Sequence, residues 1–252
     1  MQTVGDITAA LENILPLSAA FDWDNTGLAL GDRNTPVHRV LVALDPFEDT
    51  AREAAELGAE MLITHHPLLF TRPLSLTSDT GVGRTARILL ANGVSAWSAH
   101  TNLDMAEQGV NQILAQRLGL IDITGAPGLL RFGMLPEQPL REFLTRVKGA
   151  LGTPVLRFAD SGKPVNQIAV GGGACAGELK TVIAAGCDTF VTSDVKYNDF
   201  WDAQDAGVTI IDAGHFYTEN PVCGYLAGLL RENFPDVETI VSRIHRDCMK
   251  FF

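Results

Sequence analysis

Hydrophobic and polar positions along this chain follow two periods, which predict helices alternating with strands. Residues 3–14 carry apolar side chains every three or four positions, as one face of an amphipathic helix does. Residues 39–45 and 61–64 are continuous apolar runs, typical of strands that are covered on both faces. A helical stretch over 49–57 joins them, so the order strand, helix, strand predicts a right-handed βαβ unit.

The same alternation continues to the end of the chain and predicts an α/β fold. It favours two α/β domains, each with a mixed sheet flanked by helices. Glycine, proline and aspartate gather at 119–128, which is therefore the candidate domain boundary. A loop is expected over 71–83. Further helices are expected near 83–91, 109–118, 140–151, 199–206 and 221–232.

Composition narrows the class of protein. The chain has 252 residues, 46% of them hydrophobic and 19% charged, as in a soluble globular protein. No apolar run approaches the ~20 residues of a membrane helix, and the amino terminus lacks a secretory signal, so we expect a cytoplasmic protein and no membrane partner. A net charge of −11 argues against nucleic acid as a partner. The four cysteines show no metal-binding spacing and are expected to be buried or incidental thiols.

Three apolar runs end in histidines and acids. The run 61–64 ends in His65 and His66, and Pro67 then removes a backbone donor and ends the strand. The other two runs precede His100 and Asp104, and His215 and Glu219. If the three runs are neighbouring parallel strands, their ends lie at one sheet edge, where α/β proteins bind ligands. Five metal-ligand groups would then converge, namely His65, His66, Asp104, His215 and Glu219.

The spacing of His215 and Glu219 favours a metal site. Four residues apart on a helix, they share one face, and Gly214 permits a tight strand-to-helix turn before them. Imidazoles together with two carboxylates exceed the needs of one tetrahedral site and suit two metals bridged by a carboxylate. Nitrogen and oxygen donors accommodate zinc, iron, manganese, cobalt or nickel. We assign 1–122 plus 208–252 to the metal-binding domain and 123–207 to a second, inserted domain.

Several polar groups have a structural and a functional interpretation. Asp45 is either an acceptor for a ligand imidazole or a helix cap. The glycines at 171–173 suggest a phosphate loop, but a tight turn explains them better because no complete phosphate-binding motif is present. Lys196 is a candidate substrate contact and Asp194 a candidate carboxylate near the centre; a solvated lysine and a capping aspartate are the alternatives.

Four motifs occur together in the chain, namely Trp23-Asp24-Asn25-Thr26-Gly27-Leu28, Thr64-His65-His66-Pro67, His100-Thr101-Asn102-Leu103-Asp104 and Gly214-His215-Phe216-Tyr217-Thr218-Glu219. Through them the sequence resembles the type 2 GTP cyclohydrolase I-like family, also called the Nif-three-like family. The resemblance implies a two-domain α/β protomer, a toroidal homohexamer and a dinuclear centre held by His65, His66, Asp104, His215 and Glu219. It also places the Trp23–Asp24 loop near the metals. Asn198 departs from the family pattern, which often has a histidine there.

These features favour a metal-dependent hydrolase with a small-molecule substrate, a nucleotide or a related heterocycle. The resemblance names GTP, whose imidazole ring would be opened and the resulting formamide hydrolysed to formate. His100 and Asp24 are the candidates for moving protons. The alternatives are another dinuclear hydrolase, acting on a phosphoester, and a non-catalytic, metal-binding hexameric scaffold.

Overall fold

A computed structural model describes residues 1–71, 73–125 and 127–252 of the chain. Arg72, in the loop expected over 71–83, and Ala126, in the boundary expected at 119–128, lie outside the described residues. The chain forms two compact units. Unit 1 comprises Met1–Leu103 and Val222–Arg246, and unit 2 comprises Asp104–Pro221 and Asp247–Phe252.

Unit 1 is built on a five-stranded mixed sheet in the order β13-β4-β5-β6-β2. Strands β4 (Arg39–Ala43), β5 (Met61–Thr64) and β6 (Ser95–Ser98) are parallel. At the edges, β13 (Glu238–Val241) pairs parallel with β4, and β2 (Gly27–Leu30) pairs antiparallel with β6. Every residue of β5 is buried, as is every residue of β4 except the half-buried Arg39, so the prediction of strands covered on both faces is confirmed.

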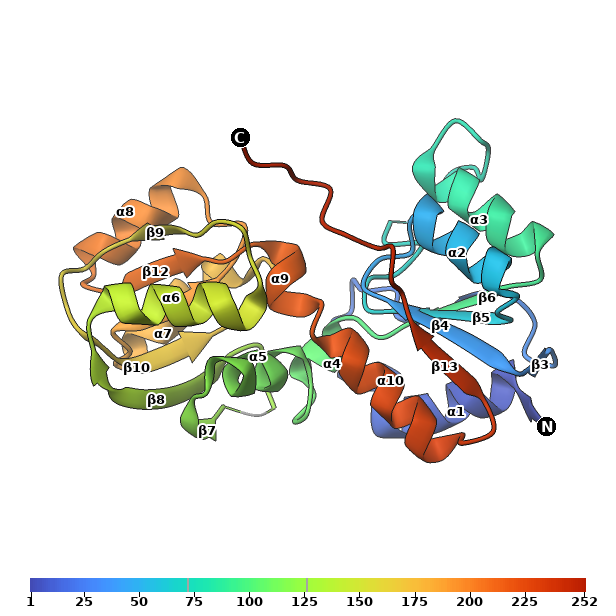
Figure 1. Ribbon diagram of the computed structural model, residues 1–252, viewed down its shortest axis with the longest axis horizontal. Coiled ribbons are helices and arrows are strands. Elements are labelled where there is room, and N and C mark those ends of the chain that lie inside the picture. Colours follow the sequence, from blue (N-terminus) through green and yellow to red (C-terminus); the bar gives the residue numbers. More distant parts are fainter. Residues whose placement is uncertain (72, 126) are drawn as a thin grey trace. The chain divides into compact units, whose positions relative to one another are not determined.

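Helices cover both faces of this sheet (Figure 1). On one face α2 (Glu48–Leu57) and α3 (Gly81–Ala91) pack against each other, and α2 joins β4 to β5 in the predicted βαβ unit. The other face carries α1 (Val4–Ile14) and α10 (Val222–Asn233). Short elements complete the unit: β1 (Gln2–Thr3), η1 (Leu17–Ala19), β3 (Pro36–Val37) and the first residues of α4 (Thr101–Met105).

Unit 2 has a six-stranded mixed sheet in the order β7-β8-β10-β11-β12-β9. The three strands β10, β11 and β12 are parallel, and the others pair antiparallel. The α/β class expected from the sequence is confirmed in both units. The strands are β7 (Ile121–Thr124), β8 (Arg131–Gln138), β9 (Arg157–Ala159), β10 (Val165–Val170), β11 (Thr189–Thr192) and β12 (Thr209–Asp212).

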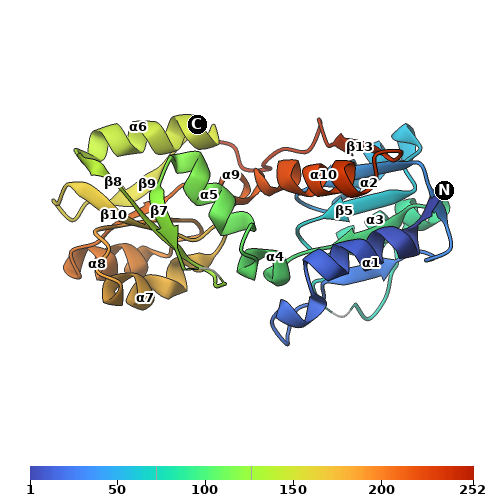
Figure 2. The same ribbon diagram turned by 90° about the horizontal axis from the view of Figure 1, so that it is seen from below.

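Successive residues of the parallel strands point to opposite faces of this second sheet, and each face has its own helical layer (Figure 2). Val191 packs in the core under α5 and α6, whereas its neighbour Phe190 packs in the core under α7 and α8. The helices are α5 (Val110–Leu118), α6 (Leu140–Leu151), α7 (Leu179–Ala184), α8 (Tyr197–Asp205) and α9 (His215–Glu219), with the short turn η2 (Cys175–Glu178) before α7.

Two expectations about the strands are corrected, and the compact units differ in extent from the expected domains. The strand before His215, β12, pairs with β11 in the sheet of unit 2, so the three histidine-bearing runs do not share one sheet. The stretch 119–128 contains β7, which pairs with β8, instead of being loop throughout. The compact units divide the chain after Leu103 and after Pro221, whereas residues 122 and 207 were expected. Strand pairing decides these points, and periodicity along the chain does not reveal it.

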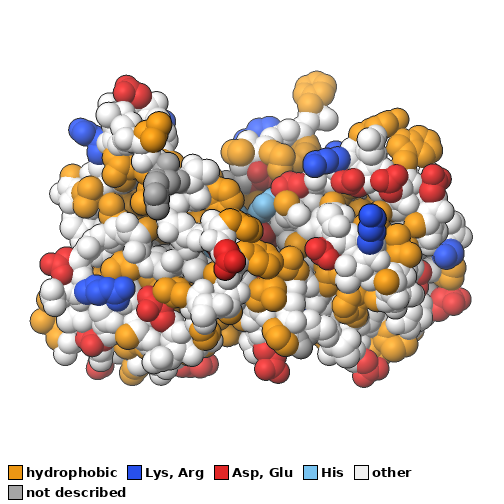
Figure 3. Space-filling view, turned by 180° about the vertical axis from the view of Figure 1, so that it is seen from behind, with side chains coloured by type: hydrophobic (Ala, Val, Ile, Leu, Met, Phe, Trp, Pro, Cys, Tyr) orange, Lys and Arg blue, Asp and Glu red, His pale blue; other side chains and the backbone are white. Residues whose placement is uncertain are grey.

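The surface is mixed in character. On the face drawn in Figure 3, lysine and arginine side chains are separated from one another by acidic and hydrophobic side chains. Across the described ranges, no helix has both the length and the apolar character needed to cross a bilayer.

Candidate metal site

Unit 1 brings three histidines together at the ends of two parallel strands. His65 and His66 follow β5, and His100 lies shortly after β6. One ring nitrogen of each lies within 4.8 Å of those of the other two. His65 is fully buried, while His66 and His100 are partly exposed. Because β5 and β6 are hydrogen-bonded neighbours, this convergence follows from the sheet itself.

The tautomer of His65 is fixed by the backbone. Its Nδ1 lies 2.8 Å from the carbonyl oxygen of Ala99. A carbonyl oxygen only accepts hydrogen bonds, so Nδ1 carries the proton and the neutral ring has its lone pair on Nε2. Metal-binding histidines in proteins are generally held in this way, by an acceptor on the other ring nitrogen.

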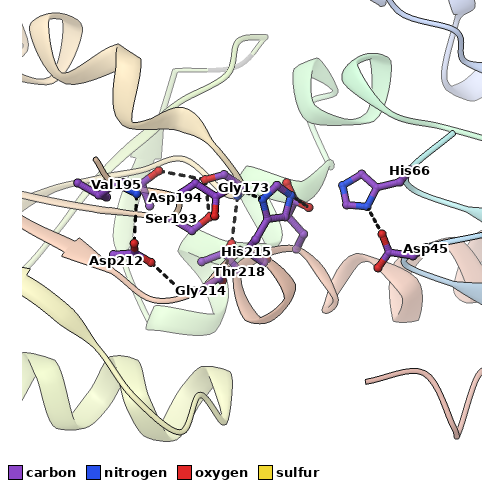
Figure 4. A network of polar contacts seen from close by, with 12 residues as sticks. Asp45, His66, Gly173, Ser193, Asp194, Val195, Asp212, Gly214, His215 and Thr218 are labelled. Atoms are coloured by element: carbon purple, nitrogen blue, oxygen red, sulfur yellow. Dashed lines mark hydrogen bonds and ion pairs between the residues drawn. The ribbon is translucent and has the colours of Figure 1, made fainter. Parts of the chain in front are cut away.

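Asp45 holds His66 (Figure 4), and it also contacts a further histidine, His245. His66 Nδ1 donates to Asp45 Oδ1 over 2.6 Å, and His245 Nε2 donates to Oδ2 over 2.7 Å. Burial alone would raise the pKa of Asp45, but the hydrogen bonds from His245 and His66 hold it far below its usual range. Of the two interpretations of Asp45, the acceptor role matches the contacts, since Phe47 occupies the N-cap of α2.

His245 lies outside the motifs that the sequence analysis singled out. It is buried, and it lies just beyond β13, the parallel neighbour of β4, while Asp45 lies just beyond β4 itself. A histidine following an apolar run was therefore the available signal, the same one that pointed to His65. The strand order needed to use it is not visible in the sequence.

Asp24 orients His100. It accepts from His100 Nδ1 at 2.9 Å and from the backbone amide and hydroxyl of Thr101 at 3.0 and 2.6 Å. Burial opposes ionisation of Asp24, yet the hydrogen bonds from Thr101 and His100 lower its pKa. The pKa of His100 is lowered, by burial first and then by the nearby His65, so its ring is held neutral. The expected pair of Asp24 and His100 is thus in direct contact.

In unit 2, His215 and Glu219 lie one turn apart on α9, as predicted. Glu219 Oε2 is 2.9 Å from His215 Nε2, and Asp194 Oδ2 is 2.7 Å from Nδ1 (Figure 4). Burial would lower the pKa of His215, but the hydrogen bonds and charges of Asp194 and Glu219 outweigh it and raise the pKa to about 10. The metal-free ring is therefore an imidazolium at neutral pH.

Asp194 reaches His215 from a left-handed backbone conformation. Its φ is +52°, which is uncommon outside glycine and is found at functional positions. Asp212, the last residue of β12, fixes the backbone nearby by accepting from the amides of Val195 and Gly214, each at 3.1 Å, and from Arg157. The hydrogen bond from His215 lowers the pKa of Asp194, so this carboxylate is ionised.

The glycines at 171–173 make room for Glu219. A Cβ added to Gly173, which has φ +62°, would lie 2.0 Å from Glu219 Oε1. The amides of Gly172 and Gly173 donate to Asn111 Oδ1 and Thr218 Oγ1, at 2.6 and 3.1 Å. Because these amides already have acceptors inside unit 2, the tight-turn interpretation holds and the phosphate-loop interpretation does not.

Asp104 and Cys175 lie near the same carboxylate. An oxygen of Asp104 lies within 4.8 Å of one of Glu219. Burial, and then the charges of Asp104 and Glu219, raise the pKa of the Cys175 thiol well above its usual range, so no thiolate competes as a donor there.

The other cysteines and Lys196 differ in their exposure to solvent. Cys223 is buried on α10, Cys187 is buried, and Cys248 is exposed. Lys196 is an exposed residue at the start of α8.

The donor chemistry fits divalent metal ions. Unit 1 supplies three imidazoles whose Nδ1 atoms face acceptors, and unit 2 supplies an imidazole with two carboxylates. These histidine and carboxylate groups could bind metal ions of the borderline class, such as zinc, iron, manganese, cobalt or nickel.

The sequence matches the family described as Duf34/NIF3 (NGG1p interacting factor 3) over residues 2–248. The chain belongs to this family. A curated relative from Clostridium perfringens, named GTP cyclohydrolase 1 type 2 homolog, is 34% identical over 98% of this chain and 99% of its own. A Helicobacter pylori protein named GTP cyclohydrolase 1 type 2 is 30% identical over 91% and 92%.

A solved structure of the Duf34/NIF3 fold agrees closely with this one. The Staphylococcus aureus hypothetical protein SA1388 superposes with a TM-score of 0.93 at 27% identity, over 100% of this chain and 99% of its own. The resemblance identified from the sequence motifs is therefore confirmed, both for the family and for the α/β fold.

Proposed function

We propose that this Duf34/NIF3 protein is a dinuclear metal-dependent hydrolase whose substrate is a nucleotide or a related heterocycle. His65 and His66 of unit 1 would hold the ions together with Asp104, His215 and Glu219 of unit 2. The observation that carries the proposal is the shared orientation of the histidines. Each of the three ligand histidines has an acceptor at Nδ1, which leaves Nε2 as the ligand atom.

Divalent ions in such a site acidify water and polarise the bond to be cleaved. The chain itself would orient the donors and move protons. Asp45 and Asp194 hold the rings of His66 and His215. Asp24 holds His100, whose Nε2 is then positioned to take a proton from water or return one to the leaving group. Glu219, on the same helix face as His215, would hold metal beside that imidazole.

GTP is the first substrate to test, because the curated relatives carry the cyclohydrolase name. Formate release and pterin-type fluorescence from GTP are measured with protein of defined metal content, and the Glu219→Gln variant is the control. Turnover that is lost in the variant supports the cyclohydrolase assignment. Absence of turnover with each of zinc, iron, manganese, cobalt and nickel contradicts GTP as the substrate.

We further propose that the chain assembles as a homohexamer, which the family resemblance implies. Sedimentation equilibrium tests the assembly directly. A mass near the 27.1 kDa of one chain would contradict it.

A further inference from the structure

Aromatic side chains surround His100, the histidine of the cluster whose ring is hydrogen-bonded to Asp24. The rings of Trp23 and Phe70 lie 6.1 and 5.8 Å from that of His100, each edge to face, and they lie 5.9 Å from each other. Phe21 lies 5.8 Å from Trp23. We call Phe21, Trp23 and Phe70 the aromatic wall. Trp23 is 60% exposed and Phe70 53% exposed, although both are large apolar residues.

Hydrogen bonds hold the aromatic wall in place. The amide of Phe21 donates to Thr101 Oγ1 at 3.0 Å, and Thr101 is the residue that follows His100. Asn25 Nδ2 donates to the carbonyl of Leu69 at 2.8 Å, which ties the Trp23 loop to the residue before Phe70. The exposed rings are therefore fixed relative to the histidine cluster within unit 1, as the walls of a preformed binding site are.

Phe70 also lines a cavity of about 910 Å³ in unit 1, which His66 and Asp45 border. This volume lies in the range of small-molecule sites. Its other lining groups are largely apolar, with Phe47 and Val82 among them. Among the described lining residues, the only permanent cation is Arg84, and its Nε donates to Glu48 Oε2 over 2.8 Å. These walls suit an uncharged, flat organic group better than a phosphate chain.

We propose that the aromatic wall and this cavity bind the planar heteroaromatic ring of the substrate, next to His66 and His100. The inference rests on the proposed function and adds the recognition element that the metal ligands do not supply. Aromatic side chains bind flat heterocycles by stacking, with little dependence on which base is present. Trp23 and Phe70 are therefore the ring-binding residues of unit 1, and neither needs to move a proton or bind metal.

Binding of guanosine monophosphate to the metal-loaded protein tests the inference, with ribose 5-phosphate as the matched ligand that lacks the ring. The Trp201→Phe variant is used as the background, because Trp201 is the other exposed indole and lies on α8 of unit 2. We expect guanosine monophosphate to quench the fluorescence of Trp23 and to bind at least about tenfold more tightly than ribose 5-phosphate. Equal affinities for the two ligands would overturn the inference.

Two substitutions locate the ring, with affinity measured by equilibrium dialysis. Trp23→Leu and, separately, Phe70→Leu should each weaken binding of guanosine monophosphate by about tenfold, whereas Trp23→Phe, which keeps a stacking ring, should change it little. Thermal unfolding checks that each variant is folded. Unchanged affinity in both leucine variants overturns the inference. A lowered sedimentation mass with unchanged affinity does so as well, because the wall would then be a subunit contact.

These outcomes separate the inference from the proposed function. Binding that depends on Trp23, without hydrolysis of any nucleotide, leaves ring recognition standing and contradicts the hydrolase. Hydrolysis of GTP with a KM that is the same in wild type, Trp23→Leu and Phe70→Leu supports the hydrolase and contradicts ring recognition.

Discussion

His100 of unit 1 is held as a neutral imidazole, whereas His215 of unit 2 is held as a cation between carboxylates. Ala99 and Asp24 engage Nδ1 of two rings in unit 1, and burial keeps the pKa of His100 low. In unit 2, Asp194 and Glu219 raise the pKa of His215 to about 10. Burial and neighbouring charges thus give His100 and His215 opposite charge states. A metal ion that binds His215 must displace its proton.

The largest expected effect is the loss of bound metal when a proposed ligand side chain is removed from either unit. His65→Ala takes an imidazole from unit 1, and Glu219→Ala takes a carboxylate from unit 2. We expect each to lower the bound metal by at least about one ion per protomer, because neither site retains enough donors. Elemental analysis after dialysis measures the metal content. His38→Ala, at an exposed histidine, is the matched control and should keep full occupancy. Full occupancy in His65→Ala or Glu219→Ala would contradict the ligand assignment.

Gly173→Ala should disturb unit 2 and leave unit 1 intact. The new Cβ would lie 2.0 Å from Glu219 Oε1, and alanine at φ +62° costs roughly 1–2 kcal/mol. We expect lower stability in urea and loss of the metal that Glu219 binds. Gly177→Ala is the control, because its added Cβ would meet no atom within 4 Å. Equal metal binding in the two variants would show that the glycine does not serve Glu219.

Replacing each orienting aspartate by asparagine compares how strongly metal affinity depends on that aspartate in the two units. Asp45→Asn removes the charge that holds His66, and metal affinity should fall by about 10–100-fold. Asp194→Asn should cost less near pH 7, because the loss of orientation is offset by weaker proton binding at His215. Metal titration by calorimetry measures both affinities. A larger loss for Asp194→Asn than for Asp45→Asn would reverse the comparison.

A separate effect is expected on the pH dependence of the metal-free protein. The folded pKa of His215 is raised from 6.5 to about 10, so its stabilising contribution is complete below about pH 6.5 and is lost as the pH rises through about 10. Urea unfolding with chelator present, from pH 7 to pH 10, should show stability falling with pH. The His215→Gln variant should show a smaller fall. Equal slopes in the two proteins would contradict the raised pKa.

Local patterns in the sequence predicted most of the elements and several contacts. The apolar run before His65 predicted β5, and the spacing of His215 and Glu219 predicted their shared helix face, because both depend on residues close together in the chain. The order of the strands was not predictable in this way. Pairing of β12 with β11, which moves His215 into unit 2, depends on hydrogen bonds between distant segments.

Three features of the site were beyond the sequence for related reasons. His245 meets Asp45 across 200 positions of the chain. The carboxylate of Asp194 reaches His215 only through a left-handed backbone conformation, which no residue pattern signals for an aspartate. The glycines at 171–173 were recognised as a turn, but their clearance for Glu219 appears only when α9 is in place.

Anomalous diffraction from crystals of the zinc-loaded protein tests the central claim most directly. We predict two zinc peaks per protomer, with Nε2 of His65 and His66 and the carboxylates of Asp104 and Glu219 among their ligands. A single peak, or zinc held by the residues of one unit alone, would contradict it.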